Sequence, residues 1–324
     1  MGLKNFPKGY TPSSSQQYAI PNILDAFKDN RFVVMQGPTG CGKSFIAKTI
    51  ANGLQKLPSR LSKIVSDYRA FETSRDNGKL VYEYADDFVN KNYGTSILTT
   101  TKALQDQYTR DFEDIKPLKG KSSYICNLDE RSFADAAPCT FSSKLKKECW
   151  DCNRCDYYEA KNKSITAKIS VESYSSFFHK PDHLKYRQLI VCDEASELEN
   201  IIVSRFSCSI ELNKLNKYSF SLLYSSNRNR FHNNLIKLQS ELEGRYVELL
   251  RMLEKHSETI SDAVKKEFKF IADLKGDLSL VIDTWQQSEY IINKAFNHNK
   301  KYIQLIPKKI DVLAQHLFKY ADKV

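Results

Sequence analysis

The stretch Phe32–Leu54, FVVMQGPTGCGKSFIAKTIANGL, decides the fold. It opens with the apolar run Phe32–Met35, which suits a buried parallel strand. The segment Gly37–Ser44 then matches the pattern G-x-x-x-x-G-K-[ST], and apolar residues at helical spacing follow it. A strand, a glycine loop and a helix in this order predict an α/β domain with a parallel sheet, in which the loop binds the phosphates of a nucleotide.

The loop residues have distinct expected roles. Backbone amides of the loop and of the helix start would cradle the phosphates, Lys43 would reach the terminal ones, and Ser44 would hold Mg²⁺. We expect Cys41 to serve only as a small residue, and a chance glycine turn is the alternative to the whole motif. The predicted nucleotide-binding residues of the loop are Gly37, Pro38, Thr39, Gly40, Cys41, Gly42, Lys43 and Ser44.

A second nucleotide motif follows the apolar run Leu189–Cys192 as the pair Asp193-Glu194. Asp193 would hold Mg²⁺ through water, and Glu194 would orient and deprotonate the attacking water. With Lys43, these carboxylates are the predicted catalytic residues. Glu194 argues against a simple kinase, which has no water to activate. The long interval between the two motifs predicts an insertion, although residues 58–92 within it are polar and carry no recognisable chemistry.

Two flanking segments carry weaker signals. Gln16 or Gln17 opens an apolar-periodic helix before the phosphate loop, and its amide suits an adenine edge, although a capped surface helix is the alternative. Ser96–Thr99 predicts a strand, after which Thr100 and Thr101 lie at its carboxyl end. Their hydroxyls could contact a nucleic-acid backbone, and capping of the following helix is the alternative.

Five of the eight cysteines are clustered with the spacing C-x12-C-x9-C-x2-C-x2-C. No signal peptide or membrane span is evident, so we expect a reducing, cytoplasmic setting, in which clustered thiols bind metal more often than they form disulfides. Four thiolates suit either Zn²⁺ or a [4Fe–4S] cluster, and spacing alone does not decide between them. The cysteines are Cys126, Cys139, Cys149, Cys152 and Cys155.

The bulk composition favours a polyanionic partner, because the net charge is +10 and the isoelectric point is near 9.0. Towards the C-terminal end, leucines recur at helical spacing from Leu235 to Leu253, and a similar pattern follows up to Leu274. These patterns predict an antiparallel helical hairpin, with a dimerising helical tail as the alternative. Tyr302–Ile306 then predicts a strand and Ile310–Phe318 a helix.

Three motifs, GPTGCGKS, SYIC…APC…C…CDYYEAK and VCDEAS, resemble the XPD/DinG-like family of superfamily-2 iron–sulfur DNA helicases over nearly the whole chain. The resemblance implies an ATP-dependent DNA helicase of DNA repair or replication. The chain would form the first motor lobe of such a helicase. This lobe would be a P-loop RecA-like parallel sheet flanked by helices, with an Fe–S insert and a helical arch. ATP, Mg²⁺ and a [4Fe–4S] cluster are the implied cofactors, with Zn²⁺ as the alternative, and single-stranded or forked DNA is the implied partner.

The resemblance also assigns domains and residues. By position, Gln16 matches the adenine contact, and Cys126, Cys139 and Cys155 match cluster ligands. The family's C-x5-C step selects Cys149 as the fourth ligand, with Cys152 as the alternative. Ser196 replaces the family's usual His. The implied domains are residues 1–115 for the first part of the RecA-like lobe, 116–170 for the four-cysteine insert, 171–205 for the continued lobe, 206–298 for the arch and 299–324 for a return to the lobe.

The family's Ser-Ala-Thr motif and second RecA-like lobe are not found before Val324. We therefore expect a separate polypeptide to supply the second lobe, and the isolated chain to hydrolyse little ATP. Two other functions stay open. One is a non-motor module or remnant that binds ATP and DNA. The other, less favoured, is a P-loop nucleotide kinase with a zinc-bearing lid.

Overall fold

The computed structural model describes residues 2–54, 94–127, 129–135, 137–140, 142–151, 155–255 and 261–324. The predicted connection over residues 58–92 lies outside this range. The chain divides into two compact units, which we describe separately. Unit 1 contains Met1–Ser123, Tyr157–Ala195 and Leu317–Val324, and unit 2 contains Tyr124–Asp156 and Ser196–His316.

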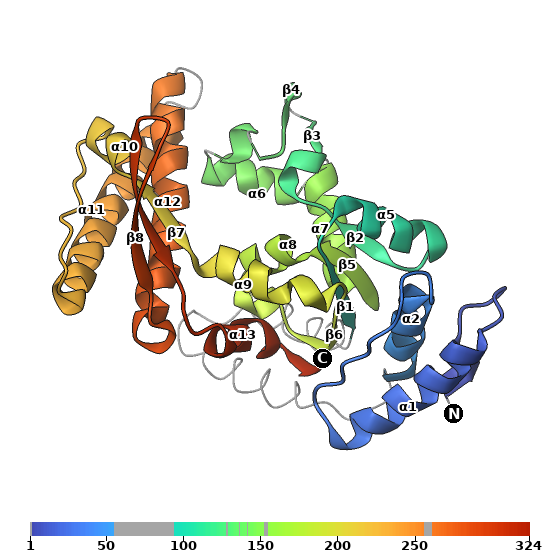
Figure 1. Ribbon diagram of the computed structural model, residues 1–324. Coiled ribbons are helices and arrows are strands. Elements are labelled where there is room, and N and C mark those ends of the chain that lie inside the picture. Colours follow the sequence, from blue (N-terminus) through green and yellow to red (C-terminus); the bar gives the residue numbers. More distant parts are fainter. Residues whose placement is uncertain are drawn as a thin grey trace, which may run out of the picture. The chain divides into compact units, whose positions relative to one another are not determined.

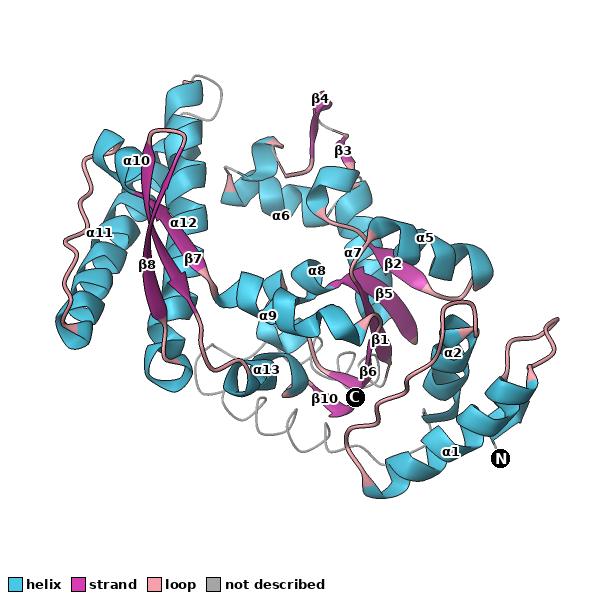
Figure 2. Ribbon diagram, viewed as in Figure 1, coloured by secondary structure: helices cyan, strands magenta, loops and turns pink. Residues whose placement is uncertain are grey.

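Unit 1 contains a five-stranded sheet in the order β10-β6-β1-β5-β2, and every neighbouring pair is parallel (Figure 2). This arrangement confirms the predicted α/β class with a parallel sheet flanked by helices. The predicted strands over residues 96–99 and 189–192 are β1 and β6. The bounds are β1 Thr95–Thr99, β2 Lys116–Leu118, β5 Ile169–Ser173, β6 Arg187–Cys192 and β10 Ala321–Lys323.

Helices cover this sheet through apolar faces (Figure 1). Ile20 of α1 and Ile50 of α2 belong to one buried cluster with Ile97, Val171 and Leu189 of the strands. Because this cluster ties α2 to the sheet, it fixes the phosphate loop that precedes the helix. The bounds are η1 Gly2–Asn5, α1 Ser14–Asp29, α2 Lys43–Leu54, α5 Lys102–Asp111, η2 Lys121–Ser123, α7 Asp156–Thr166, α8 Tyr174–His179, η4 Asp182–Leu184 and η5 Ala195–Glu197.

The predicted buried strand over Phe32–Met35 is wrong. The segment forms no strand, and Phe32 and Val34 are 49% and 90% exposed, while Val33 and Met35 pack against the core. Two backbone hydrogen bonds of 2.9 Å, from Val33 N to Val324 O and from Val324 N to Arg31 O, attach it beside β10. Since only alternate residues of an extended chain face one side, a four-residue apolar run does not distinguish a strand buried on both faces from this half-buried segment.

Unit 2 combines helices with two small antiparallel sheets, β3-β4 and β7-β9-β8. The predicted helical hairpin is present as α11 and α12, although its identity with a helicase arch stays a prediction. The bounds are β3 Ile125–Cys126, β4 Asp129–Phe133, η3 Pro138–Thr140, α6 Ser143–Asp151, α9 Leu198–Phe206, β7 Cys208–Glu211, α10 Leu212–Lys217, α11 Arg228–Lys255, α12 Asp262–Ser288, β8 Ile291–Asn297, β9 Lys300–Ile306 and α13 Asp311–Phe318, which ends in unit 1.

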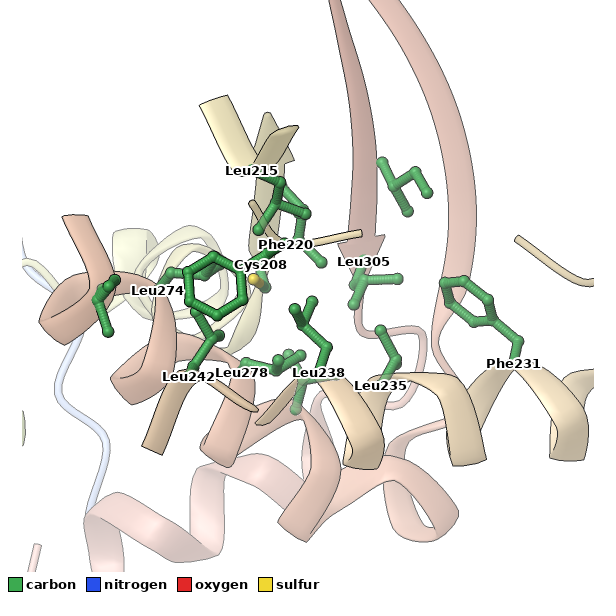
Figure 3. Close-up of a cluster of buried hydrophobic side chains, with 14 of the residues drawn as sticks. Cys208, Leu215, Phe220, Phe231, Leu235, Leu238, Leu242, Leu274, Leu278 and Leu305 are labelled. Atoms are coloured by element: carbon green, nitrogen blue, oxygen red, sulfur yellow. The ribbon is translucent and has the colours of Figure 1, made fainter. Parts of the chain in front are cut away.

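The core of unit 2 lies between the long helices and one face of the three-stranded sheet (Figure 3). Leu238 and Leu242 of α11 and Leu278 of α12 are at most 1% exposed, and they join Cys208 of β7 and Leu305 of β9 in one cluster. The leucine periodicity of the sequence therefore marks the buried face of each helix. Among the described helices, none combines the length and the hydrophobicity that a membrane span requires.

Candidate nucleotide-binding site

Two glycines shape the phosphate loop. Gly40 and Gly42 have φ values of +81° and +78°, which lie in the left-handed region that glycine adopts without strain. A Cβ atom at Gly42 would lie 2.1 Å from Nε2 of Gln16. The helix α2 begins at the next residue, Lys43. The loop thus leads directly into a helix N-terminus, whose free amides and positive dipole end favour an anion.

Gln16 contacts the backbone of this loop. Its Nε2 donates to Cys41 O at 3.4 Å and to Gly42 O at 3.3 Å, while its Oε1 accepts from Ser13 N at 2.9 Å in a capping box. The side chain is 7% exposed. Gln16 therefore positions the loop relative to α1, and its adenine contact stays a prediction. The alternative, Gln17, is exposed and donates to Pro12 O at 2.9 Å.

The second motif follows β6 directly. Asp193 N donates to Leu98 O at 2.9 Å, so the pairing with β1 continues one residue past β6. Glu194 N donates to Oδ1 of Asp193 at 3.1 Å, and Glu194 has a φ of 53°, which is uncommon for a residue other than glycine. The chain turns sharply here, with Asp193 half-buried and Glu194 exposed.

Two buried tyrosine hydroxyls meet at Asp193, and the sequence did not single out either. Tyr174, at the start of α8, donates to Asp193 O at 3.1 Å. The hydroxyl of Tyr108 on α5 acts on the Asp193 carboxylate and lowers its pKa. Burial is the main cause that raises the pKa of both tyrosines above the usual value, so each remains a hydrogen-bond donor. Tyr108 lies on the buried face of α5, and in the sequence only its hydroxyl could have indicated this polar role.

The electrostatics link Lys43 to Asp193. Burial raises the pKa of the Asp193 carboxyl, whereas the Tyr108 hydrogen bond and the Lys43 charge act in the opposite direction. The Lys43 ammonium itself donates to Gly37 O at 3.4 Å across the loop. Ile46 of α2 and Val191 of β6 pack in the same apolar cluster, so the helix that follows the phosphate loop lies against the strand that leads to Asp193. Burial also raises the pKa of the neighbouring Cys192 to about 12, which keeps that thiol protonated.

The predicted metal ligands are not brought together in the same way. Cys126 lies on β3, Cys139 on η3 and Cys149 on α6, all buried, and Cys155 precedes α7. Within the described ranges, no three His, Cys, Asp or Glu residues are grouped so that they could hold a metal ion. Cys152 lies outside the described residues, and the cluster stays a prediction.

Comparison with known proteins adds an NTPase signature. The model of the family Novel STAND NTPase 3 matches residues 16–172, just under half of the chain, and the match ends before Asp193. One similar solved structure is described as truncated XPD. Its TM-score is 0.43 at 13% identity, over 94% of this chain and 91% of that chain. No curated protein matched. The family match supports a nucleotide-hydrolysing P-loop protein.

Proposed function

We propose that the chain is the nucleotide-binding lobe of an ATP-dependent DNA helicase of the iron–sulfur DEAD/DEAH type, which couples ATP hydrolysis to movement along single-stranded DNA. The observation that supports this proposal most is the phosphate loop at the start of α2, a helix that packs in one apolar cluster with β6, the strand that leads to Asp193. The order of the sequence motifs supports the choice of a helicase.

The residues of the site have different roles in ATP hydrolysis. The loop amides and Lys43 bind the phosphates, while Ser44 and Asp193 would hold Mg²⁺, which neutralises phosphate charge. The exposed Glu194 carboxylate orients a water molecule and accepts its proton as the water oxygen attacks the γ-phosphorus. The bond from that phosphorus to the bridging oxygen breaks, and ADP and inorganic phosphate leave. Tyr108 and Tyr174 hold Asp193 in place during this step.

A helicase site closes between two lobes, and arginines of the second lobe stabilise charge on the transferred phosphoryl group. We propose that a second lobe, on a separate polypeptide or on a further segment of the protein, completes this site. Without those arginines the rate falls by roughly 10³–10⁵-fold. The lobe studied alone is therefore expected to bind ATP and to hydrolyse it slowly.

The carboxyl end of β1 is the proposed contact for the DNA backbone within unit 1. Thr101 Oγ1 accepts from Leu104 N at 3.2 Å, which is the helix-capping role that the sequence left open. Thr100 is exposed beside it. The capping hydroxyl accepts this bond and keeps its own O–H to donate, so we assign the phosphate contact to Thr100 together with Thr101.

The proposed function is tested by measuring ATP binding and hydrolysis with and without oligo(dT), and with and without a candidate second lobe. We expect ATP binding that Lys43→Ala abolishes, slow hydrolysis by the chain alone, and faster, DNA-stimulated hydrolysis with the second lobe. ATP binding that is insensitive to Lys43→Ala would contradict the assigned site. Phosphoryl transfer to a nucleoside monophosphate would instead identify a kinase.

A non-motor ATP- and DNA-binding module is the second candidate, because the matched family is described as an NTPase and not as a helicase. The two functions differ in one measurable property. A motor displaces a strand from forked DNA in the presence of ATP and a second lobe. A non-motor module binds and hydrolyses ATP but displaces no strand under any combination.

The iron–sulfur proposal is supported by cysteine spacing alone, and metal content tests it. We expect anaerobically purified protein to be brown with about four irons per chain. Cys149→Ser should lose the iron, whereas Cys152→Ser should keep it. A colourless protein with one zinc would favour the alternative metal, and a metal-free folded protein would contradict both.

A further inference from the structure

The positive charge of the chain is concentrated in two segments of unit 2. Residues 212–240 and 290–310 contain ten Lys and Arg and no Asp or Glu, which leaves 39 Lys and Arg against 39 Asp and Glu elsewhere. The entire net charge of +10 thus resides in these two segments. Each segment is flanked directly by acidic residues, Glu211 and Glu241 for the first and Glu289 and Asp311 for the second, but within the segments the basic residues outnumber the acidic ones and favour a polyanion.

The two segments meet in space. Lys294 Nζ lies 3.5 Å from the centroid of the Tyr224 ring, and Lys301 N donates to Oδ1 of Asn213 at 3.2 Å. Arg228 of α11 donates to Tyr290 O at 3.0 Å. The segments therefore contact each other, and we call α10, the first turn of α11 and the β8–β9 hairpin the basic face. Two of its lysines have acidic partners, because Lys300 pairs with Glu211 at 3.4 Å and Lys309 pairs with Glu289.

The basic face carries an aromatic side chain outside the core. Phe296 of β8 is 68% exposed, and its cross-strand partner is Lys301. Cross-strand partners project to the same side of a sheet, so the ring and the ammonium lie next to each other. The strand β8 is the outer strand of its sheet, and the adjoining turn holds His298 and Asn299 at positive φ. An exposed ring beside lysines on a hairpin is well placed to stack on a base.

We propose that the basic face binds single-stranded nucleic acid. Lys294 and Lys301, on the same face of the hairpin as Phe296, contact the phosphates together with Lys214 of α10, and Phe296 stacks on an unpaired base. A duplex offers no free base to that ring, and an acidic polypeptide would not need it, so the exposed ring favours a single strand. The proposal deepens the proposed function, on which the choice of DNA rests, and it assigns a second contact besides that of Thr100 and Thr101.

The test is the binding of a short fluorescent oligo(dT), without nucleotide, measured by anisotropy over a range of salt concentrations. Lys294→Ala with Lys301→Ala should make the slope of log K against log[salt] shallower by about 1.4, because each phosphate contact contributes about 0.7. Phe296→Ala should weaken binding by roughly 5- to 100-fold, and Phe296→Trp should restore it. These side chains are exposed, so circular dichroism should show all variants folded.

The matched control is Lys4→Ala with Lys28→Ala, which removes the same charge from exposed positions of unit 1 and should leave the salt slope unchanged. The proposal is overturned if the Phe296 and lysine variants bind oligo(dT) as wild type does. It is also overturned if poly-glutamate or duplex DNA binds equally well and depends on the same residues. ATP binding by the wild-type chain, measured in parallel, shows separately whether the proposed function fails.

Discussion

Glu194→Gln is expected to lower the rate of ATP hydrolysis by roughly 10²–10⁴-fold while ATP binding is retained, because a general base contributes a factor of this size. The amide keeps the shape of the side chain but cannot accept the proton of the attacking water. Glu194 is exposed, so the substitution should leave the fold intact. Hydrolysis with the second lobe present and the dissociation constant for ATP are the two measurements.

The control for this variant is Glu197→Gln, three residues further on. Glu197 is also exposed, its Oε2 accepts from Asn200 Nδ2 at 3.0 Å, and it has no role in the proposed mechanism. Its hydrolysis rate should equal that of the wild type. Equal losses in both variants would show that charge near η5, and not proton transfer at Glu194, determines the rate.

The second large effect is expected in the interior of unit 1, where Glu172→Gln should lower the free energy of unfolding by about 3–5 kcal/mol. Lys180 Nζ lies 2.6 Å from Oε1 of the fully buried Glu172. Arg187 is buried nearby, and its Nε donates to Ser96 Oγ, which in turn donates to Glu172 Oε1. Glu172 is the acidic partner that both cations share. A glutamine amide at position 172 carries no charge, so the buried cations Lys180 and Arg187 would lose the carboxylate that they share.

Urea unfolding followed by circular dichroism measures this effect. The double variant Glu172→Gln with Lys180→Met should recover much of the lost stability, because it removes one buried cation together with the anion. Asp25→Asn, which breaks the exposed pair with Lys28, should change stability little. If Glu172→Gln unfolds at the same urea concentration as the wild type, the buried pair does not stabilise the fold.

The sequence predicted those parts of the fold that local patterns encode. The apolar run at Leu189 and the leucine repeats from Leu235 onward indicate their strand and helices because burial on one face imposes a period. The phosphate loop was predictable because Gly40 and Gly42 must adopt positive φ. The half-buried segment at Phe32 was not predictable, since its exposure depends on how it lies beside β10, a tertiary property.

The remaining parts of the site depend on contacts between residues far apart in the chain. Nothing near Gln16 in the sequence indicates that its amide contacts the backbone at Gly42. Likewise, Tyr108 of α5 and Tyr174 of α8 gain their roles only because the fold directs both hydroxyls to Asp193. The metal prediction had spacing but no folded geometry to support it. Spacing shows which ligands are available, whereas coordination requires that the thiols converge.

The attachment beside β10 also determines when the site can form during folding. Arg31 donates through Nη2 to Ala321 O at 2.9 Å, a contact between residues 290 positions apart, and Lys323 Nζ donates to Asn30 O at 2.8 Å. Closing so large a loop is slow and costs entropy before the contacts stabilise the fold. On the ribosome, the phosphate loop is made long before β10. We therefore expect the chain to bind nucleotide only after β10 has been made and has paired.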